Sequence, residues 1–278
     1  MFNLKRVAGL LCVAVVTALF GMANVGTASA ANESITLKTT VKPTKGKVYK
    51  TRSVPARMQL SVKVNVPAGT AKMNPLKRAV VRFPKQMTFN PNNRRTPVCT
   101  DKKLGKTSNL AAGTAGVASL CPKSIIGTGT AQIYLAKVVS DTTLVKDPQL
   151  LVFNAGKDKK GNAKIKIYAY SKNTNVGILM YGTLSRKAVI NVAIPVLSND
   201  SATTSFVLGI PGAPIKDGGK TFKGRDGGYA RIKCTNGKWV SGGTFTLGER
   251  TYPAGTATGP SSTVKARNTS VKCRASRG

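Results

Sequence analysis

The side chains of this sequence can support few kinds of catalysis. None of its 278 residues is histidine, which excludes Ser-His-Asp and Cys-His centres, HExxH zinc sites and a histidine general base. A glycosidase-type carboxylate pair would have to come from only nine acidic residues, which form no cluster in the sequence. Serine and lysine do not form an SxxK motif in a helical setting. The sequence therefore predicts a protein that is not an enzyme, with a histidine-free hydrolase kept as an alternative.

Four of the five cysteines form the second chemically distinctive group, and they are Cys99, Cys121, Cys234 and Cys273; the fifth, Cys12, lies in an N-terminal segment that is expected to be removed. Their spacing contains no CxxC pair, which argues against structural zinc. An even number of cysteines in an exported chain favours disulfides instead. Four cysteines allow three pairings, and loop closure favours the sequential one, Cys99 with Cys121 and Cys234 with Cys273. No metal or other cofactor is expected.

Basic residues dominate the charge, with 44 lysines and arginines against nine acidic residues. If a leader containing Lys5 and Arg6 is removed, 42 basic and nine acidic residues remain, a net charge of +33. Such a field attracts polyanions and fades over about 8 to 10 Å at physiological salt. The expected partners are anionic cell-wall polymers or other extracellular polyanions. A sequence-specific nucleic-acid reader is not expected, because no helix-turn-helix, zinc-finger or RNP-like pattern is present.

One stretch concentrates this charge and is the best local candidate for polyanion binding. Its basic residues are Lys157, Lys159, Lys160, Lys164 and Lys166. The alternative is that the basic residues, which are spread along the chain, form only solvated strand faces. A second functional hypothesis is a lectin-like or adhesin-like module that binds through loops and aromatics, such as Trp239 with Tyr229. A lone tryptophan beside a disulfide, however, more often belongs to a core.

The N-terminal residues resemble an export signal. Lys5 and Arg6 precede an apolar run over residues 7–21, and Ala28-Ser29-Ala30 supplies an A-x-A cleavage pattern. We expect residues 1–30 to be removed and the mature chain to begin near Ala31. No second long apolar run follows, so the mature protein is expected to be soluble and to have no transmembrane segment. The predicted location is secreted, either extracellular or associated with the cell wall.

Alternation of apolar and polar residues is the main structural pattern. It is clearest over residues 58–66, where every even position is apolar, and it recurs over 35–41 and 188–194. Helical periodicity is confined to residues 108–120. These patterns predict an all-β fold, an antiparallel β-sandwich of the immunoglobulin-like or a related kind, built as one large or two packed β units.

Two hairpins are expected to present the chemically distinctive residues. Residues 151–153 and 163–170 flank a basic turn at 156–162, which places the lysine-rich stretch on a hairpin tip. Residues 229–235 and 238–245 flank Asn236-Gly237, which suits a tight type I′ turn.

Turn-forming residues gather over 209–226 and suggest a boundary there. We expect a β-sandwich domain over residues 31–210 and a C-terminal β-hairpin region over 211–278, which is either separate or part of the same sandwich. The Asp-Gly-Gly repeats of this stretch predict turns, because a calcium loop needs more carboxylates. Residues 127–131, Gly-Thr-Gly-Thr-Ala, lack phosphate-loop spacing and predict a turn or a strand edge.

Two segments resemble secreted actinobacterial proteins of unknown function. One joins residues 96–99, Thr-Pro-Val-Cys, to residues 121–131, Cys-Pro-Lys-Ser-Ile-Ile-Gly-Thr-Gly-Thr-Ala; the other covers residues 229–239 with its Gly-Lys-Trp. The resemblance implies an exported β-sandwich protein and brings no activity or binding site with it.

Overall fold

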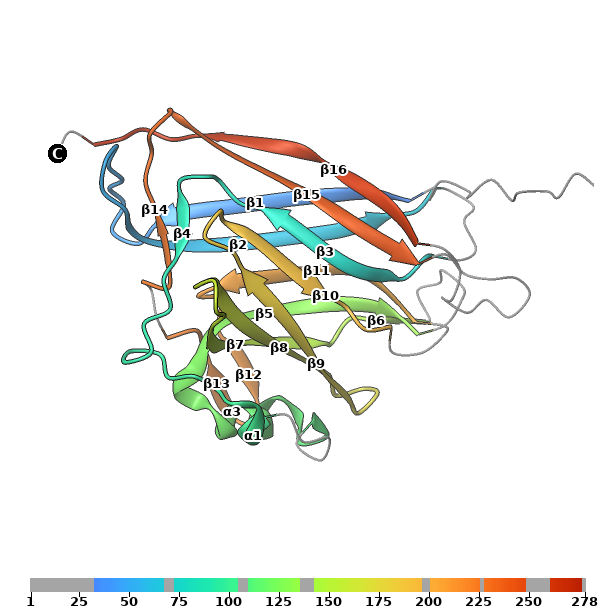
Figure 1. The fold of residues 1–278 in the computed structure, drawn as a ribbon. Helices are drawn as coiled ribbons and strands as arrows, with labels where there is room; N and C mark the ends of the chain where they lie inside the picture. Colours follow the sequence, from blue (N-terminus) through green and yellow to red (C-terminus); the bar gives the residue numbers. More distant parts are fainter. Residues whose placement is uncertain are drawn as a thin grey trace, which may run out of the picture.

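The chain folds into antiparallel strands with few helices (Figure 1). The structure is a computed structural model that describes residues 33–67, 73–104, 110–135, 143–196, 201–225, 228–248 and 261–276. The predicted signal segment, residues 1–30, lies outside these ranges. The N-terminal strands are β1 (Ser34–Pro43), β2 (Val54–Asn65), β3 (Leu76–Arg82) and β4 (Met87–Phe89). The helical elements of the described residues are α1 (Asp101–Leu104), α3 (Gly113–Leu120) and the 3₁₀ turn η1 (Pro122–Ser124).

The remaining strands follow the helices. The middle of the chain forms β5 (Ile125–Tyr134), β6 (Leu144–Val145), β7 (Gln149–Lys157), β8 (Ala163–Ser171), β9 (Val176–Leu184), β10 (Val189–Ala193) and β11 (Ala202–Ile210). The C-terminal part forms β12 (Ile215–Asp217), β13 (Lys220–Phe222), β14 (Ala230–Ile232), β15 (Lys238–Gly248) and β16 (Ser261–Lys272).

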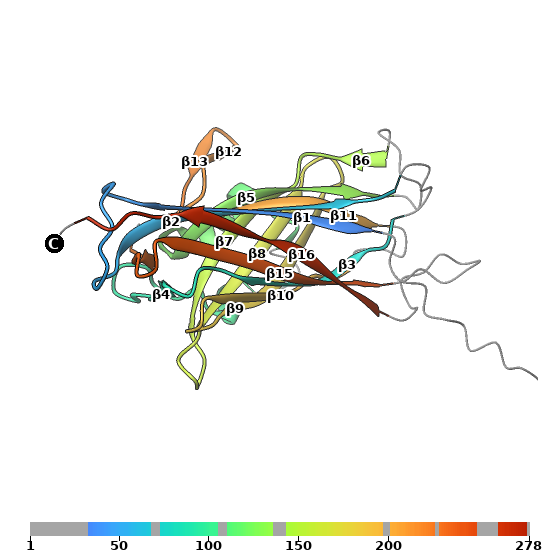
Figure 2. The same ribbon diagram turned by 90° about the horizontal axis from the view of Figure 1, so that it is seen from above.

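Within the described part of the chain, fourteen strands belong to one continuous sheet. Its strands pair in the order β1-β2-β11-β5-β7-β8-β9-β10-β3-β15-β16, while β6 pairs with β5, and β14 joins β2 to β4. The outermost strands of this order, β1 and β16, lie side by side (Figure 2). The sheet therefore folds back on itself and encloses a core, which gives the predicted all-β sandwich from a single rolled sheet.

The enclosed core, here called the inner core, follows the alternation read from the sequence. In β2 the side chains at positions 58, 60, 62 and 64 are buried, and those at 57, 59 and 63 are exposed. Ile35, Leu37 and Val41 of β1 point into the same core, as do Ile190 and Val192 of β10. The alternation of apolar and polar residues in these three strands therefore predicted correctly which face of each strand is buried.

A second core, here called the outer core, lies on the opposite face of β5, β7 and β8. The helices α1 and α3 and the hairpin β12–β13 cover this face (Figure 1). Strand β7 is buried on both faces, since Leu150 and Val152 point into the inner core and Leu151 and Phe153 into the outer core. The uninterrupted apolar run of residues 150–153 is the sequence signal for such double burial.

Both disulfides have the sequential pairing that loop closure favoured. Cys99 and Cys121 are joined in the outer core, and Cys234 and Cys273 are joined beside the inner core. Each core therefore contains one covalent cross-link.

The second predicted hairpin is wrong. Strand β14 pairs with β2 and β4, whereas β15 pairs with β3 and β16, so residues 230–232 and 238–245 do not form a ladder with each other. Gly237 does have a positive φ of 70°, but the turn at Asn236-Gly237 makes a corner between two parts of the sheet. Burial of Ala230 and Ile232 against the end of β2 outweighs the local preference for a hairpin.

The structure differs in part from the predictions for residues 127–131 and for the helix over residues 108–120. Residues 127–131 lie inside β5, between β7 and β11, and are neither a turn nor a strand edge. Their glycines permit a close approach, because a Cβ on Gly129 would collide with the Val207 carbonyl of β11. The predicted helix over residues 108–120 is present as α3 over its second half, and residues 105–109 lie outside the described ranges.

The C-terminal region continues the same sheet. Strands β14, β15 and β16 add to it, and Phe245, Leu247 and Ala266 contribute to the inner core. Residues 211–225 instead cross the outer face, where Asp217-Gly218-Gly219-Lys220 makes a tight turn between β12 and β13 with positive φ at both glycines. This segment is therefore built from turns, as its Asp-Gly-Gly sequence predicts.

Candidate functional site

A groove of about 990 Å³ on the outer surface collects basic side chains from distant parts of the sequence. Fifteen described residues line it, and six of these are basic: Arg82, Lys85, Arg186, Lys187, Lys233 and Lys238. No carboxylate is among the described lining residues. The other lining groups include amides and hydroxyls, so the groove offers hydrogen-bond partners as well as positive charge.

Arg186 and Lys187 reach the groove from the turn between β9 and β10. The amide of Ala188 donates to the Ser185 carbonyl at 3.0 Å, which closes a turn with Arg186 and Lys187 as its two central residues. Ala188 follows with a φ of 58°, the left-handed residue that typically completes a three-residue hairpin loop. Both basic side chains are exposed at this corner.

Arg82 and Lys85 come from the end of β3 and the chain after it. Arg82 points away from the inner core, opposite Val189 of β10 and Gly242 of β15. The Phe83 amide donates to the Ala188 carbonyl at 2.8 Å, which fixes this segment beside the β9–β10 turn. The sheet thus brings together two pairs of basic residues that lie about a hundred positions apart in the chain.

Lys233 and Lys238 come from the corner between β14 and β15. The Lys233 amide donates to the Gln86 carbonyl at 3.3 Å, and the Cys273 amide donates to the Gly237 carbonyl at 2.9 Å. The disulfide Cys234–Cys273 closes the same corner. Lys238 also lies directly opposite Lys272 on β16, a like-charge cross-strand pair that costs stability unless a counterion is present.

The lysine-rich hairpin is confirmed as a hairpin, formed by β7 and β8. Four of its five candidate lysines are exposed: Lys157, Lys159, Lys160 and Lys164. The tip lies against the β9–β10 turn, since the Arg186 amide donates to Asn162 Oδ1 at 3.2 Å and Gly161 faces the Arg186 guanidinium. The basic surface of the tip therefore continues into the groove through Arg186.

Lys166 does not belong to this surface, and its assignment as a polyanion-binding residue is wrong. It is 3% exposed in the outer core. Its Nζ donates to the Cys99 carbonyl at 2.6 Å and pairs with Asp101 Oδ1 at 2.9 Å. Lys164 and Lys166 alternate with isoleucines and lie on the face of β8 that points away from the inner core, but helices from another part of the chain cover this face at Lys166.

The five carboxylates of the described residues all accept hydrogen bonds within the fold. Glu33 binds the Asn74 amide, Asp147 binds Ser171 and Asn173, and Asp217 binds the Ala115 amide. Hydrogen bonds from the Asn162 side chain and backbone lower the pKa of Asp158. A hydrogen bond from Lys166 is the main cause of the lowered pKa of Asp101. None of these five carboxylates lines the groove, although Asp158 lies on the adjacent β7–β8 tip, where it accepts hydrogen bonds from Asn162.

The aromatic residues considered for sugar stacking are buried. Trp239 is 7% exposed and its Nε1 donates to the Lys233 carbonyl at 3.0 Å, while Tyr229 is fully buried in the inner core. The interpretation of Trp239 as a core residue is therefore correct. Within the described part of the chain, no three His, Cys, Asp or Glu residues are grouped so that they could hold a metal ion.

Comparison of the chain with protein-family models, with curated proteins and with solved structures gave no match. The resemblance to secreted actinobacterial proteins accordingly stays a prediction from the sequence. Among the described residues, no helix combines the length and the apolar character that crossing a bilayer requires.

Proposed function

We propose that this chain is a secreted, non-enzymatic protein that binds anionic polymers of the cell envelope, or other extracellular polyanions, in its basic groove. The observation that carries the proposal is the convergence of six basic side chains from three separate segments into one groove, with no carboxylate among its described lining residues. Basic residues that only formed solvated strand faces would not need to converge on one groove. A groove with several fixed cations can instead follow a chain of regularly spaced anionic groups.

The fold supports binding in preference to catalysis. The groove has no histidine or carboxylate to move a proton among its described lining residues, and the four mature cysteines are paired in disulfides. Arginine and lysine side chains offer charge-assisted hydrogen bonds to phosphate, sulfate or carboxylate groups. The exposed lysines at the β7–β8 tip extend the basic surface beyond the groove itself.

The experiment is a binding assay of the oxidised protein with purified cell walls, with inorganic polyphosphate as a defined polyanion, and with dextran as a neutral control. Binding that neutralises several anionic groups weakens steeply between about 50 and about 200 mM salt. We expect binding to walls and polyphosphate at low salt, loss at high salt, and no binding to dextran. Salt-insensitive binding to the neutral glycan would contradict the proposal and favour the lectin-like alternative.

Two variants that each lose four positive charges distinguish binding in the groove from attraction by the net charge of the protein. The groove variant carries Arg82→Gln, Arg186→Gln, Lys187→Gln and Lys238→Gln. The matched control carries Lys38→Gln, Lys42→Gln, Arg57→Gln and Lys63→Gln, which are exposed side chains on the outer face of β1 and β2.

We expect the groove variant to lose at least about tenfold in polyphosphate affinity, equivalent to about 1.4 kcal/mol. The control should lose less than about threefold. Equal losses in the two variants would show that the charge acts only as a diffuse field and that the groove is not the site. Thermal unfolding of both variants checks that each is folded.

A further inference from the structure

The floor of the basic groove contains a position where three neighbouring strands meet at a glycine. Strand β15 lies between β3 and β16 (Figure 1). Gly242 of β15 lies directly opposite Arg82 of β3, and on its other side a β-bulge sets two residues of β16, Arg267 and Asn268, against this one glycine. Arg82, Gly242 and Asn268 all line the groove. The bulge therefore adds an amide side chain to the groove beside a basic one.

The missing side chain of Gly242 lets its two neighbours come together. A Cβ at this position would collide with Asn268 Oδ1 and would lie 3.7 Å from Arg82 Nη2. The amide and the guanidinium thus reach the same point of the backbone from opposite sides. Both residues are exposed, and within the part of the chain that the structure describes neither side chain makes a hydrogen bond or an ion pair. Their donor groups are available to a ligand.

A guanidinium and a carboxamide at one point suit an oxyanion. The guanidinium offers a fork of N–H donors to two oxygens, and the amide supplies a further N–H donor. Because Arg82 and Asn268 approach from different strands, a tetrahedral group, whose oxygens point in different directions, can accept from both at once. A planar carboxylate that the fork engages turns both of its oxygens to one side. The arrangement therefore favours a phosphate group over a carboxylate.

A second position for an anion lies along the same strand. Lys238, Val240 and Gly242 alternate on the outer face of β15, which places Lys238 about 14 Å from Gly242 at the rise of a strand. Lys238 lies opposite Lys272, a like-charge pair that a bound anion would stabilise. Between the two positions Val240 is 41% exposed. This spacing matches a polymer whose anionic groups are joined by neutral carbon segments.

We propose that the groove recognises phosphodiester polymers whose phosphates are joined by neutral polyol segments. One phosphate is held by Arg82 and Asn268 over Gly242, a polyol segment covers Val240, and another phosphate lies at Lys238. This inference rests on the proposed function, because it names the class of polymer that the same basic groove binds. It assigns a role to two uncharged residues, Gly242 and Asn268, on which a diffuse positive field does not depend.

The test measures the affinity of the full oxidised chain for a synthetic glycerol-phosphate oligomer, for polyglutamate and for dextran sulfate of equal charge, all at the same salt concentration. We expect the glycerol-phosphate oligomer to bind more tightly than the carboxylate and sulfate polymers. Equal or tighter binding of either of these two would overturn the assignment to phosphodiesters.

Two variants that keep the net charge locate the phosphate. Asn268→Ala removes the amide, and Gly242→Ala introduces a Cβ that displaces the exposed Asn268 side chain. Asn268→Ala should weaken binding of the glycerol-phosphate oligomer at least about tenfold, the loss expected for one hydrogen bond to a charged group. Gly242→Ala should lower the affinity in the same direction. Asn173→Ala, at the exposed turn between β8 and β9, is the matched control and should bind like the parent.

Inorganic polyphosphate separates failure of this inference from failure of the proposed function. If the parent binds polyphosphate while both folded variants bind the glycerol-phosphate oligomer like the parent, the inference is wrong and the groove is a site for polyanions in general. If the parent binds none of these polymers, both are wrong. A loss in Asn173→Ala as large as in Asn268→Ala would also contradict the inference. Thermal unfolding checks each variant, and Asn268→Ala decides the test if Gly242→Ala does not fold.

Discussion

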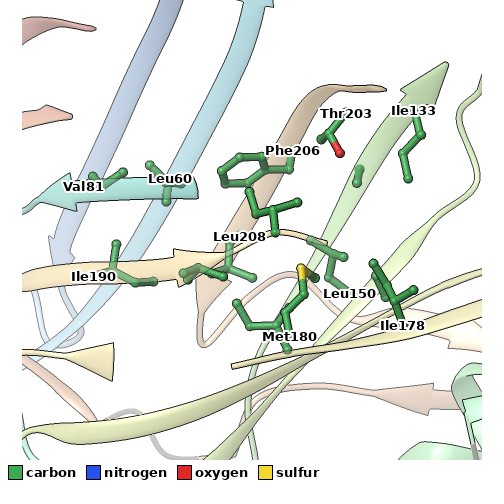
Figure 3. A pocket seen from close by; sticks show the side chains of 16 residues that line it. Leu60, Val81, Ile133, Leu150, Ile178, Met180, Ile190, Thr203, Phe206 and Leu208 are labelled. Carbon is green, nitrogen blue, oxygen red and sulfur yellow. The ribbon is translucent and has the colours of Figure 1, made fainter. Parts of the chain in front are cut away.

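The inner and outer cores use the same three strands in different ways. Strands β5, β7 and β8 turn one face to each core. The inner core is enclosed by strands and built almost entirely from apolar side chains, yet it leaves a cavity of about 60 Å³ (Figure 3). Small inward side chains line this cavity, among them Ala79, Ala131 and Ala169. The outer core is small, is covered by helices and a hairpin, and buries polar side chains together with the Cys99–Cys121 disulfide.

The polar groups of the outer core are hydrogen-bonded. The Lys166 ammonium binds the Cys99 carbonyl and Asp101, and the Tyr168 hydroxyl donates to the Leu110 carbonyl at 2.6 Å. Burial raises the pKa of Tyr168. The comparison of the two cores shows that an irregular covering layer requires specific polar contacts. Strands with alternating apolar residues can instead bury an apolar face and still leave a cavity beside it.

The largest expected effect compares a phenylalanine from each core. Phe153→Ala removes a fully buried ring from the outer core and should lower the free energy of unfolding by about 3 to 5 kcal/mol. Phe206→Ala removes a partly exposed ring that lines the cavity, and we expect a loss below about 2 kcal/mol. Denaturant unfolding measures both values. Equal losses would contradict the difference in packing between the cores.

The second comparison adds volume to each core. Ala118 of α3 is fully buried in the outer core, so Ala118→Leu should cost about 1 to 3 kcal/mol through overpacking. Ala169→Leu should change stability by less than about 1 kcal/mol, because its added carbons enter the existing cavity. Ala193→Leu, on the exposed outer face of β10, is the control, with an expected change within about 0.5 kcal/mol. A cost of several kcal/mol for Ala169→Leu would show that the cavity walls are as rigid as the outer core.

Local patterns predicted the elements of the inner core well. The alternation in β1, β2 and β10 gave the correct buried faces, because a strand repeats every two residues and one face meets the enclosed core. The β7–β8 hairpin and both disulfides were also predicted correctly, since short loop closure controls each of them. The partners of β14 were not predictable in this way, because their contacts with β2 and β4 join distant segments.

The candidate sites depend even more on distant contacts. Arg82, Arg186 and Lys238 come together only because β3 lies between β10 and β15 in the sheet. Lys166 looked like its exposed neighbour Lys164, and only the position of α1 and Cys99 distinguishes the two. The alanines of the cavity are small residues within ordinary alternating strands, so the sequence shows that each faces inward and does not show that they face one another.

The smallest expected effect concerns the ion pair at the edge of the outer core. Asp101 accepts hydrogen bonds from Lys166 and, at 3.1 Å, from Tyr181. Its side chain is 70% exposed, so solvent screens the interaction and Asp101→Asn should cost less than about 1 kcal/mol at neutral pH. Desolvation and the bond to Asp101 raise the pKa of Tyr181, so this hydroxyl stays protonated as a donor.

The pH dependence of this effect has a definite sign. The hydrogen bond from Lys166 lowers the pKa of Asp101 below its ordinary value of 3.8. The stabilisation is therefore complete well above pH 3.8 and is lost as the pH falls through the lowered pKa of the folded state. Denaturant unfolding across this range should show the parent and Asp101→Asn converging as the solution becomes more acidic. A gap that stays constant or widens on acidification would show that Asp101 acts through its shape and neutral contacts, and that Lys166 is held in the outer core chiefly by the Cys99 carbonyl.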